Sequence, residues 1–365
     1  MDEFPIKIAY VTNNCTPMIN GVSVAIDTLQ NGLQLRGHIV KVIAPSHKNS
    51  DESPNAAIRL SSINLTNKLY YPIAFCTTRK LRKIFDSHEF DIIHSHHPFG
   101  LGSTALSASC RNIRIPIVFT YHTLYEFYLH YVPMLDVAIF HNIVRTAAIK
   151  YAQRCDYVIA PCYHVGEFLS NHINVEKIFV IRTPPREPLP HKIGDAEEGS
   201  LLLVSRLSRE KNIDLALKAF SEIRKTMHNA VLTIAGDGPE RTRLLRLSKN
   251  LGISESVCFR GALCYEDLSK LYATSSCILF TSTTETQALV LWEAYSYGVN
   301  FVAVDSSASR EVSNELAYGI VCDSTPISMA ESVIRAVGMK YNHHTSRVVL
   351  GKEIDKIEKL YESII

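Results

Sequence analysis

The stretch Ser282-Thr-Thr-Glu-Thr-Gln-Ala-Leu-Val-Leu-Trp-Glu-Ala-Tyr-Ser-Tyr-Gly298 holds two glutamates, Glu285 and Glu293, eight positions apart. The apolar run Cys277–Phe280 is typical of a buried strand, and the apolar spacing from about Ala288 predicts a helix. Glu285 is therefore expected at the carboxyl end of a strand, where α/β sheets bind ligands, beside free helix amides that favour an anion. Two carboxylates there suit a sugar nucleotide; the alternative is a surface loop with Glu285 capping the helix and Glu293 solvated.

Short apolar runs alternate with helical patterns along the 365 residues, which is the mark of parallel α/β units and of more than one domain. In the first half we expect strands at Lys7–Val11, Val40–Ala44, Asp91–His94, Ile115–Thr120, Tyr157–Ala160 and Ile178–Ile181. The pattern restarts after a proline-rich stretch, with strands at Leu201–Ser205, Ala230–Ala235, Val257–Phe259, Cys277–Thr281 and Asn300–Val304. The sequence therefore predicts two Rossmann-like, doubly wound parallel-sheet domains that face each other across a cleft. We place them at residues 1–185 and 200–345, with a linker at 186–199 and a terminal helix within 346–365.

Composition narrows the class of protein. The formal net charge of +2 argues against nucleic acid as the main partner. Nine scattered cysteines without a C-x-x-C pair indicate free thiols in a reducing compartment. No apolar run reaches the roughly 18–20 residues of a membrane span, and no signal peptide is visible before the first strand. We therefore predict a cytoplasmic protein whose membrane contact, if it has any, is peripheral.

Two loops of the second half carry residues suited to phosphate. Arg206 and Lys211 lie in Val204-Ser-Arg-Leu-Ser-Arg-Glu-Lys-Asn212, which follows a predicted strand, and two such cations would neutralise a departing diphosphate. Gly236-Asp-Gly238 follows the next strand and permits a close backbone approach. The alternatives are solvated surface cations and an ordinary turn.

Histidine-rich motifs mark the first half, namely Ile93-His-Ser-His-His-Pro-Phe99 and Phe119-Thr-Tyr-His-Thr-Leu-Tyr125. Three histidines within four residues raise the possibility of zinc, but their nearest partners lack metal-ligand spacing, so we predict no metal. Ile19-Asn-Gly-Val-Ser23 precedes a helical pattern and is interpreted as a turn. Because asparagine tolerates left-handed backbone, we expect Asn20 to support that turn in place of a glycine.

These motifs together resemble the retaining glycosyltransferases of family four, which have the GT-B fold. Three sequence motifs are similar to those of bacterial 1,2-diacylglycerol 3-glucosyltransferases, namely Thr-Glu-Thr-Gln, His-x-His-His-Pro-Phe and Thr-Tyr-His-Thr-x-Tyr. The resemblance implies an enzyme that moves a hexose, above all glucose from UDP-glucose, to a membrane lipid such as diacylglycerol. It implies retention, no metal and no cofactor, an N-terminal acceptor-binding domain, a C-terminal nucleotide-sugar domain and a terminal helix that crosses back to the first domain. A soluble or other lipid acceptor, as in phosphatidylinositol mannosyltransferases, and a lapsed nucleotide-binding relative remain alternatives.

The resemblance also assigns roles residue by residue. The catalytic residues it implies are His122, Arg206, Lys211 and Glu285. Donor binding is implied for Gly21, Arg206, Lys211, Gly236, Gly238, Arg260, Glu285, Thr286, Gln287, Ala288, Leu289 and Glu293. Acceptor binding is implied for Asn20, His96, Tyr125 and Tyr128. The chain departs from the pattern at Ala288, where relatives carry glycine, and at Asn20, which replaces the first of two adjacent glycines.

A basic helical pattern at Thr77–Phe85 suits an anionic membrane surface. It carries four cations, Arg79, Lys80, Arg82 and Lys83, opposite an apolar stripe. This pattern predicts a peripheral contact with the cytoplasmic face of a membrane. A solvated helix that packs its apolar stripe on the core explains the same pattern equally well.

Overall fold

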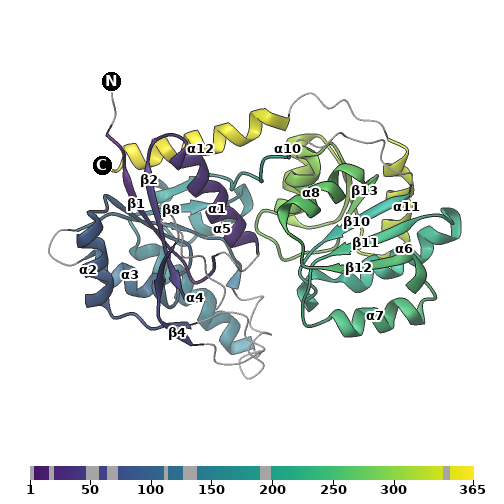
Figure 1. Cartoon of the computed structure of the whole chain (residues 1–365), viewed down its shortest axis with the longest axis horizontal. Coiled ribbons are helices and arrows are strands. Elements are labelled where there is room, and N and C mark those ends of the chain that lie inside the picture. The colour runs from purple at the N-terminus through teal and green to yellow at the C-terminus, as the bar shows by residue number, and fades with distance from the viewer. Residues whose placement is uncertain are drawn as a thin grey trace. The chain divides into compact units, whose positions relative to one another are not determined.

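The computed structural model describes residues 4–15, 20–46, 57–63, 73–110, 114–125, 138–189, 199–339 and 346–365. The chain forms two compact units (Figure 1). The first unit consists of Met1–Pro184 and Gly351–Ile365, and the second of Pro185–Leu350.

The first unit is built on a seven-stranded parallel sheet with strand order β3-β2-β1-β6-β7-β8-β9. Its strands are β1 (Lys7–Val11), β2 (Ile39–Pro45), β3 (Ile58–Leu60), β6 (Ile92–Ser95), β7 (Ile117–Thr120), β8 (Tyr157–Ala160) and β9 (Ile178–Val180). A separate antiparallel pair is formed by β4 (Ser62–Ile63) and β5 (Ile73–Ala74). The helices are α1 (Gly21–Gln34), α2 (Thr78–His88), α3 (Leu101–Ser109), α4 (Ala138–Arg154), α5 (Tyr163–Ser170) and α12 (Ser346–Glu362).

Both faces of this sheet are covered, because alternate residues of a strand point to opposite faces. In β1, Ala9 and Val11 join a core with α2, α3, α4 and α5. Ile8 and Tyr10 of the same strand join a second core with α1 and α12. Burial on both faces explains why the strand reads as a nearly continuous apolar run.

The last helix of the chain completes the second core of the first unit. The side chains of Ile354, Ile357, Leu360 and Tyr361 repeat at helical spacing and are buried there. The Arg182 N–H donates to the Glu353 carboxylate over 2.9 Å, which ties α12 to the segment that follows β9.

The second unit is a six-stranded parallel sheet with order β12-β11-β10-β13-β14-β15. Its strands are β10 (Ser200–Val204), β11 (Val231–Ala235), β12 (Val257–Gly261), β13 (Cys277–Phe280), β14 (Asn300–Val304) and β15 (Ile320–Cys322). Its helices are α6 (Ile213–Thr226), α7 (Arg241–Asn250), α8 (Tyr265–Thr274), α9 (Leu289–Ser296), α10 (Ser307–Leu316) and α11 (Pro326–Val337). Numbered within the unit, the order is that of the doubly wound dinucleotide-binding sheet, and its direction reverses between β10 and β13.

The expected strands are confirmed to within one or two residues at each end. The pattern missed β3, β4, β5 and β15, each of which is only two or three residues long. Such short runs do not show a strand period.

The basic helix α2 differs from the prediction at one cation. Leu81 and Phe85 are buried in the core, as the packed-helix alternative expects. Arg82, predicted to face a membrane, is only 8% exposed. Its guanidinium bonds the Asp86 carboxylate at 2.7 Å and the Ala108 carbonyl at 3.3 Å. The prediction for Arg82 is therefore wrong, because its charge is already satisfied inside the unit.

Within the part of the chain that the structure describes, no helix combines the length and the apolar composition that a membrane crossing requires.

Candidate active site

The switch point of the second unit brings two of the predicted residues together. The loops after β10 and β13 leave adjacent parallel strands at the same edge of the sheet. Lys211, from the first loop, forms an ion pair with Glu285, from the second. The Thr281 hydroxyl also donates to the Lys211 carbonyl over 2.7 Å, so backbone and side chain both join the loops. A cation and a carboxylate are thus fixed side by side where open α/β sheets bind ligands.

The Gly236-Asp-Gly238 turn holds the loop that carries Arg206. A β-carbon at Gly236 would lie 1.9 Å from the Ser205 carbonyl oxygen, and one at Gly238 would lie 2.4 Å from that of Leu207. Neither position has space for a side chain, so the close approach requires glycine. The Leu207 N–H donates to the Asp237 carbonyl over 3.0 Å, which fixes the half-buried Arg206 next to this turn.

Helix α9 begins without a side-chain cap. Its N-cap residue is Ala288, in the left-handed region at φ +53°, and the methyl side chain of this residue offers the first-turn amides no hydrogen bond. Leu289 is the first residue of the helix, and Thr286 and Gln287 are buried just before it. Because Glu285 pairs with Lys211 instead, the alternative in which it caps the helix is wrong. An uncapped helix start of this kind attracts an anion.

Glu293 lies within α9 and is buried, with 7% of its surface exposed. The alternative of a solvated glutamate is therefore wrong. Burial raises the pKa of Glu293, while a hydrogen bond from the Tyr272 hydroxyl, 2.7 Å from Oε2, and the charge of Arg186 lower it. A buried carboxylate with one oriented donor is prepared to accept hydrogen bonds from a ligand.

Arg260 is placed apart from this group. It is exposed on the edge strand β12, which β11 and β10 separate from β13.

The first unit gathers four histidines at the carboxyl ends of β6 and β7. His96 Nδ1 lies 2.9 Å from His122 Nε2, and the two rings stack. His94 stacks on His96 with ring centroids 4.3 Å apart. The Tyr361 hydroxyl, 2.5 Å from Nδ1, and the Thr120 hydroxyl, 2.7 Å from Nε2, hold the His94 ring.

Burial keeps these imidazoles neutral. Desolvation lowers the pKa of His94 to about 3 and that of His97 to about 4. The pKa values of His96 and His122 are lowered well below the ordinary value, by desolvation first and by the neighbouring histidines second. Neutral imidazoles can orient and accept or donate hydrogen bonds, but they do not supply a positive charge.

Asn20 contradicts the expectation of a left-handed turn. Its backbone is extended, with φ −156° and ψ 172°. Its side chain caps α1 by accepting from the Val22 and Ser23 amides over 3.0 Å each, and Gly21 is the exposed first helical residue. The capping bonds fix the extended backbone, and they occupy two of the first-turn amides.

Tyr125 is half-buried and packs edge-on against Phe99. Tyr128, the remaining predicted acceptor residue, lies outside the described residues.

Comparison with known proteins assigns the chain. Residues 19–184 match the family model Glycosyltransferase Family 4, and residues 188–349 match Glycosyl transferases group 1. The chain is 30% identical to alpha-monoglucosyldiacylglycerol synthase from Streptococcus pneumoniae over 86% of this chain and 74% of that protein. This chain belongs to the family 4 glycosyltransferases.

Further relatives of this glycosyltransferase agree. The protein of the same name from Acholeplasma laidlawii is 29% identical over 79% of this chain and 78% of its own length. The solved structure of sucrose-phosphate synthase from Thermosynechococcus elongatus matches with a TM-score of 0.77 at 16% identity, covering 98% of this chain and 99% of that one. The expectation of a glycosyltransferase with the GT-B fold is confirmed.

Sequence reasoning missed two tyrosines of this glycosyltransferase, one that holds the predicted site residue Glu293 and one that holds His94, whose ring stacks on the predicted site residue His96. Tyr272 bonds Glu293, and Tyr361 bonds His94 from a helix 267 positions away in the sequence. Nothing in the local pattern of either helix signals such a partner.

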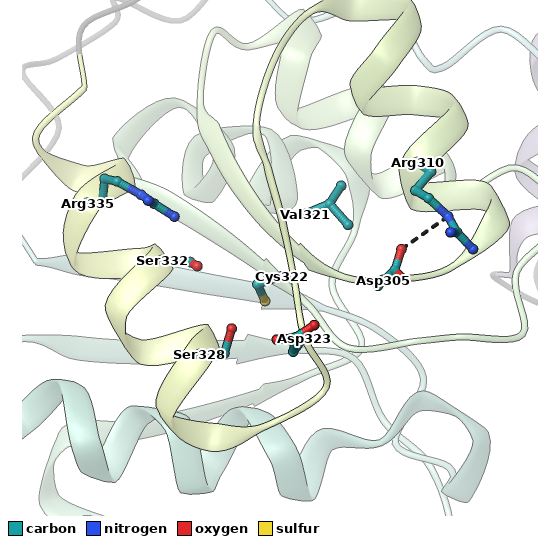
Figure 2. A pocket seen from close by; sticks show the side chains of 8 residues that line it. All are labelled: Asp305, Arg310, Val321, Cys322, Asp323, Ser328, Ser332 and Arg335. Atoms are coloured by element: carbon teal, nitrogen blue, oxygen red, sulfur yellow. Dashed lines mark ion pairs between the residues drawn. The ribbon is translucent and has the colours of Figure 1, made fainter.

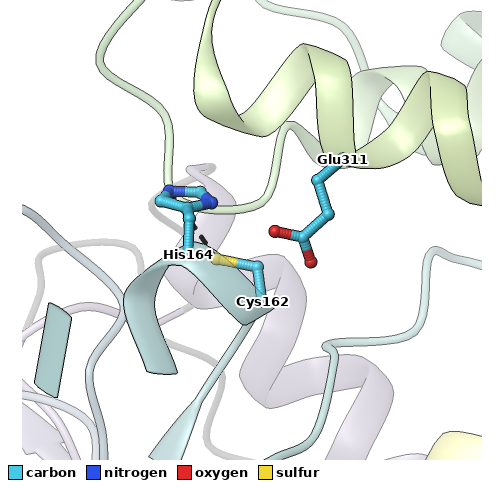
Figure 3. Close-up of side chains that lie close together, drawn as sticks. All are labelled: Cys162, His164 and Glu311. Carbon is cyan, nitrogen blue, oxygen red and sulfur yellow. Dashed lines mark hydrogen bonds between the residues drawn. The ribbon is translucent and has the colours of Figure 1, made fainter. Parts of the chain in front are cut away.

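Two other groups of side chains lie away from these residues. A pocket of about 460 Å³ opens beside the ends of β14 and β15 (Figure 2) and is lined by Asp305, Arg310, Val321, Cys322, Asp323, Ser328, Ser332 and Arg335. Figure 3 draws Cys162, His164 and Glu311, which are potential metal ligands. The first two belong to the first unit and Glu311 to the second, so the three are not counted as one ligand set.

Proposed function

We propose that this glycosyltransferase transfers glucose from UDP-glucose to a membrane lipid such as diacylglycerol, with retention at the anomeric carbon and without a metal ion. The observation that carries the proposal is the Lys211–Glu285 pair at the switch point, beside the uncapped start of α9. The names of the two alpha-monoglucosyldiacylglycerol synthases support both glucose and the lipid acceptor.

The ion pair suggests how the donor is received. Without a donor, Lys211 neutralises the Glu285 carboxylate. A diphosphate offers Lys211 and Arg206 a partner with more charge, and the amides of α9 add to its binding. Glu285 is then released to accept hydrogen bonds from the sugar hydroxyls. Glu293, which the Tyr272 hydroxyl holds, accepts those of the ribose without such a release.

The transfer itself needs stabilisation of the leaving group above all. The bond from the anomeric carbon to the β-phosphate oxygen breaks, and the bond to the acceptor oxygen forms on the same face of the sugar. The proton of the acceptor hydroxyl passes to the departing phosphate oxygen. Arg206 and Lys211 neutralise the charge that grows there. We propose that His122, whose neutral ring His96 orients, stabilises the reacting sugar. Trapping a covalent glycosyl-enzyme intermediate would rule out this single-step route.

Radiolabelled transfer from UDP-glucose to vesicles with and without diacylglycerol tests the proposal. We expect label in lipid only when diacylglycerol is present, and a loss of about 100-fold or more in Glu285→Gln. Glu255→Gln, the same change at an exposed position of the second unit, is the matched control. Transfer that proceeds equally well to a soluble sugar would refute the lipid acceptor, and full activity of Glu285→Gln would refute the site.

We also propose a peripheral membrane contact through α2. Arg79, Lys80 and Lys83 are exposed on this helix, and Phe75, 56% exposed, precedes it. Each cation near an anionic surface contributes about 1 kcal/mol, so the three together change vesicle affinity by roughly 100-fold. Changing all three to glutamine should abolish sedimentation with phosphatidylglycerol vesicles. The same triple change at Lys225, Arg246 and Lys249 of the second unit is the control. Equal sedimentation of both variants would refute the assignment to α2.

A further inference from the structure

Three tyrosines of the second unit connect Glu293 to the segment Arg186–Leu189. Tyr265, Ser269 and Tyr272 are spaced four and three residues apart, so they share one face of α8. Tyr297, the C-cap of α9, follows Glu293 by four residues and therefore lies on the same side of that helix. The two faces meet, because the rings of Tyr272 and Tyr297 stack at 5.2 Å and within 9° of parallel.

Hydrogen bonds run through this contact. The Tyr272 hydroxyl donates to Glu293 Oε2 over 2.7 Å, and both residues are buried. The Tyr297 hydroxyl lies 2.5 Å from the Ser269 hydroxyl and 3.2 Å from that of Tyr265. Because buried hydroxyls need partners, this group resists the rotation of any one member.

The segment that begins the second unit is bonded to the same tyrosines. The Tyr265 hydroxyl donates to the Glu187 carbonyl over 2.6 Å, and the Leu189 N–H donates to the Tyr297 hydroxyl over 3.3 Å. The Arg186 guanidinium lies over the Tyr265 ring, 4.9 Å from its centroid. Three contacts therefore fasten Arg186–Leu189 to Tyr265 of α8 and to Tyr297 at the end of α9, the helix that carries Glu293.

We propose that Tyr272 and Tyr297 are positioning residues of the donor site, which orient Glu293 toward the nucleotide and couple its state to the segment Arg186–Leu189. This inference rests on the proposed role of Glu293 in binding the ribose. Tyr272 fixes one carboxylate oxygen and leaves the other to the ligand. Tyr297 packs on Tyr272 and bonds the Leu189 N–H, so a change in the orientation of the Glu293 side chain reaches the segment with which the second unit begins.

The charge of Glu293 gives a readout that mere loss of packing would not change. Burial raises the pKa of this carboxylate, and two groups lower it, namely Tyr272 from α8 and Arg186 from the segment that begins the second unit. Removing the Tyr272 hydroxyl removes a hydrogen bond that lowers the pKa of Glu293, so this pKa rises and the carboxylate takes up a proton at higher pH. UDP binding, which needs the ionised form, would then be lost at higher pH than in the wild type.

Two variants and one control test the inference. Tyr272→Phe should weaken UDP binding about ten-fold or more in titration calorimetry. As the pH is lowered, this variant should also lose UDP affinity at a higher pH than the wild type. Tyr297→Phe should speed hydrogen exchange of the Leu189 amide about five-fold or more in the ligand-free enzyme. Tyr295→Phe makes the same change on α9, where the ring packs against Tyr318 instead, and should alter neither.

The outcomes separate this inference from the proposed function. Equal UDP affinity and pH dependence in Tyr272→Phe and the wild type would overturn the positioning role. Equal exchange at Leu189 in Tyr297→Phe and the wild type would overturn the coupling. A wild-type enzyme that does not bind UDP would refute the proposed donor instead, and the exchange measurement would still decide whether the tyrosines hold the segment.

Discussion

We expect acid to destabilise the first unit before the second, because its buried histidines are held neutral. In the unfolded chain His94 binds a proton at its ordinary pKa of 6.5, whereas in the folded unit its pKa is about 3. Between these values the unfolded state holds more protons, so stability falls as the pH falls. At about pH 5, His94 alone lowers the free energy of unfolding by about 2 kcal/mol relative to about pH 7.5.

The loss of stability in acid is large because folding lowers the pKa of all four buried histidines, so each contributes in the same direction. His97, with a folded pKa of about 4, contributes a similar loss, and His96 and His122 add to it. A loss of at least about 4 kcal/mol is a large part of the roughly 5–15 kcal/mol that stabilises a domain. The first unit should therefore unfold in mild acid.

Each unit can be observed separately. Trp292, the only tryptophan of the chain, lies in the second unit and reports on it by fluorescence. Hydrogen exchange of β6 and β7 amides reports on the first unit. In His94→Gln one fewer proton is taken up on unfolding. The slope of the first unit's unfolding free energy against pH should therefore be smaller by up to about 1.4 kcal/mol per pH unit. His228→Gln, at an exposed position of the second unit, should not change it. An unaltered slope in His94→Gln, or equal acid sensitivity of both units, would refute the reasoning.

Further changes in each unit have expected outcomes. Lys211→Met removes the ion-pair partner of Glu285 and one cation for the diphosphate, so we expect steady-state transfer to fall about 100-fold, and unchanged turnover would contradict the site. Asn20→Ala removes the cap of α1 and should lower the stability of the first unit to urea by about 1 kcal/mol; a loss near zero would mean that the cap is not formed. Ala288→Gly relieves a left-handed backbone and should stabilise the second unit by about 1 kcal/mol in the same assay, which a loss of stability would refute. Because burial raises the pKa of Glu293, the folded unit holds the extra proton and its stability falls as the pH rises through that pKa; urea unfolding of Glu293→Gln should lack this dependence, and an identical profile would refute it.

The sequence predicted features that depend on neighbours along the chain. The apolar runs located the strands, and the order strand, loop, helix placed Glu285 after β13 and Glu293 within α9. Arg82 was predictable in part, because Asp86 lies four residues later on the same helix face and accepts its hydrogen bond. The four cations within positions 79–83 suggested a basic surface only while the Arg82–Asp86 pair was not considered.

Contacts between distant segments could not be predicted in this way. The backbone of Asn20 was assigned from the tolerance of asparagine for left-handed geometry, but the capping bonds to Val22 and Ser23 fix it as extended. Tyr272 meets Glu293 because two helices pack face to face. That packing depends on the sheet face on which both helices lie, which no local period describes.

The membership of α12 in the first unit bears on the order in which the protein folds during synthesis. Residues 185–350 form the second unit and are synthesised before residues 351–365 of the first unit. The first unit therefore cannot complete its core until these last residues, including Tyr361, are made, although most of it was synthesised before the second unit. During that interval the apolar residues of β1 and α1 that α12 covers remain open to solvent. A chain that stops short of α12 should therefore fail in the unit that was synthesised first.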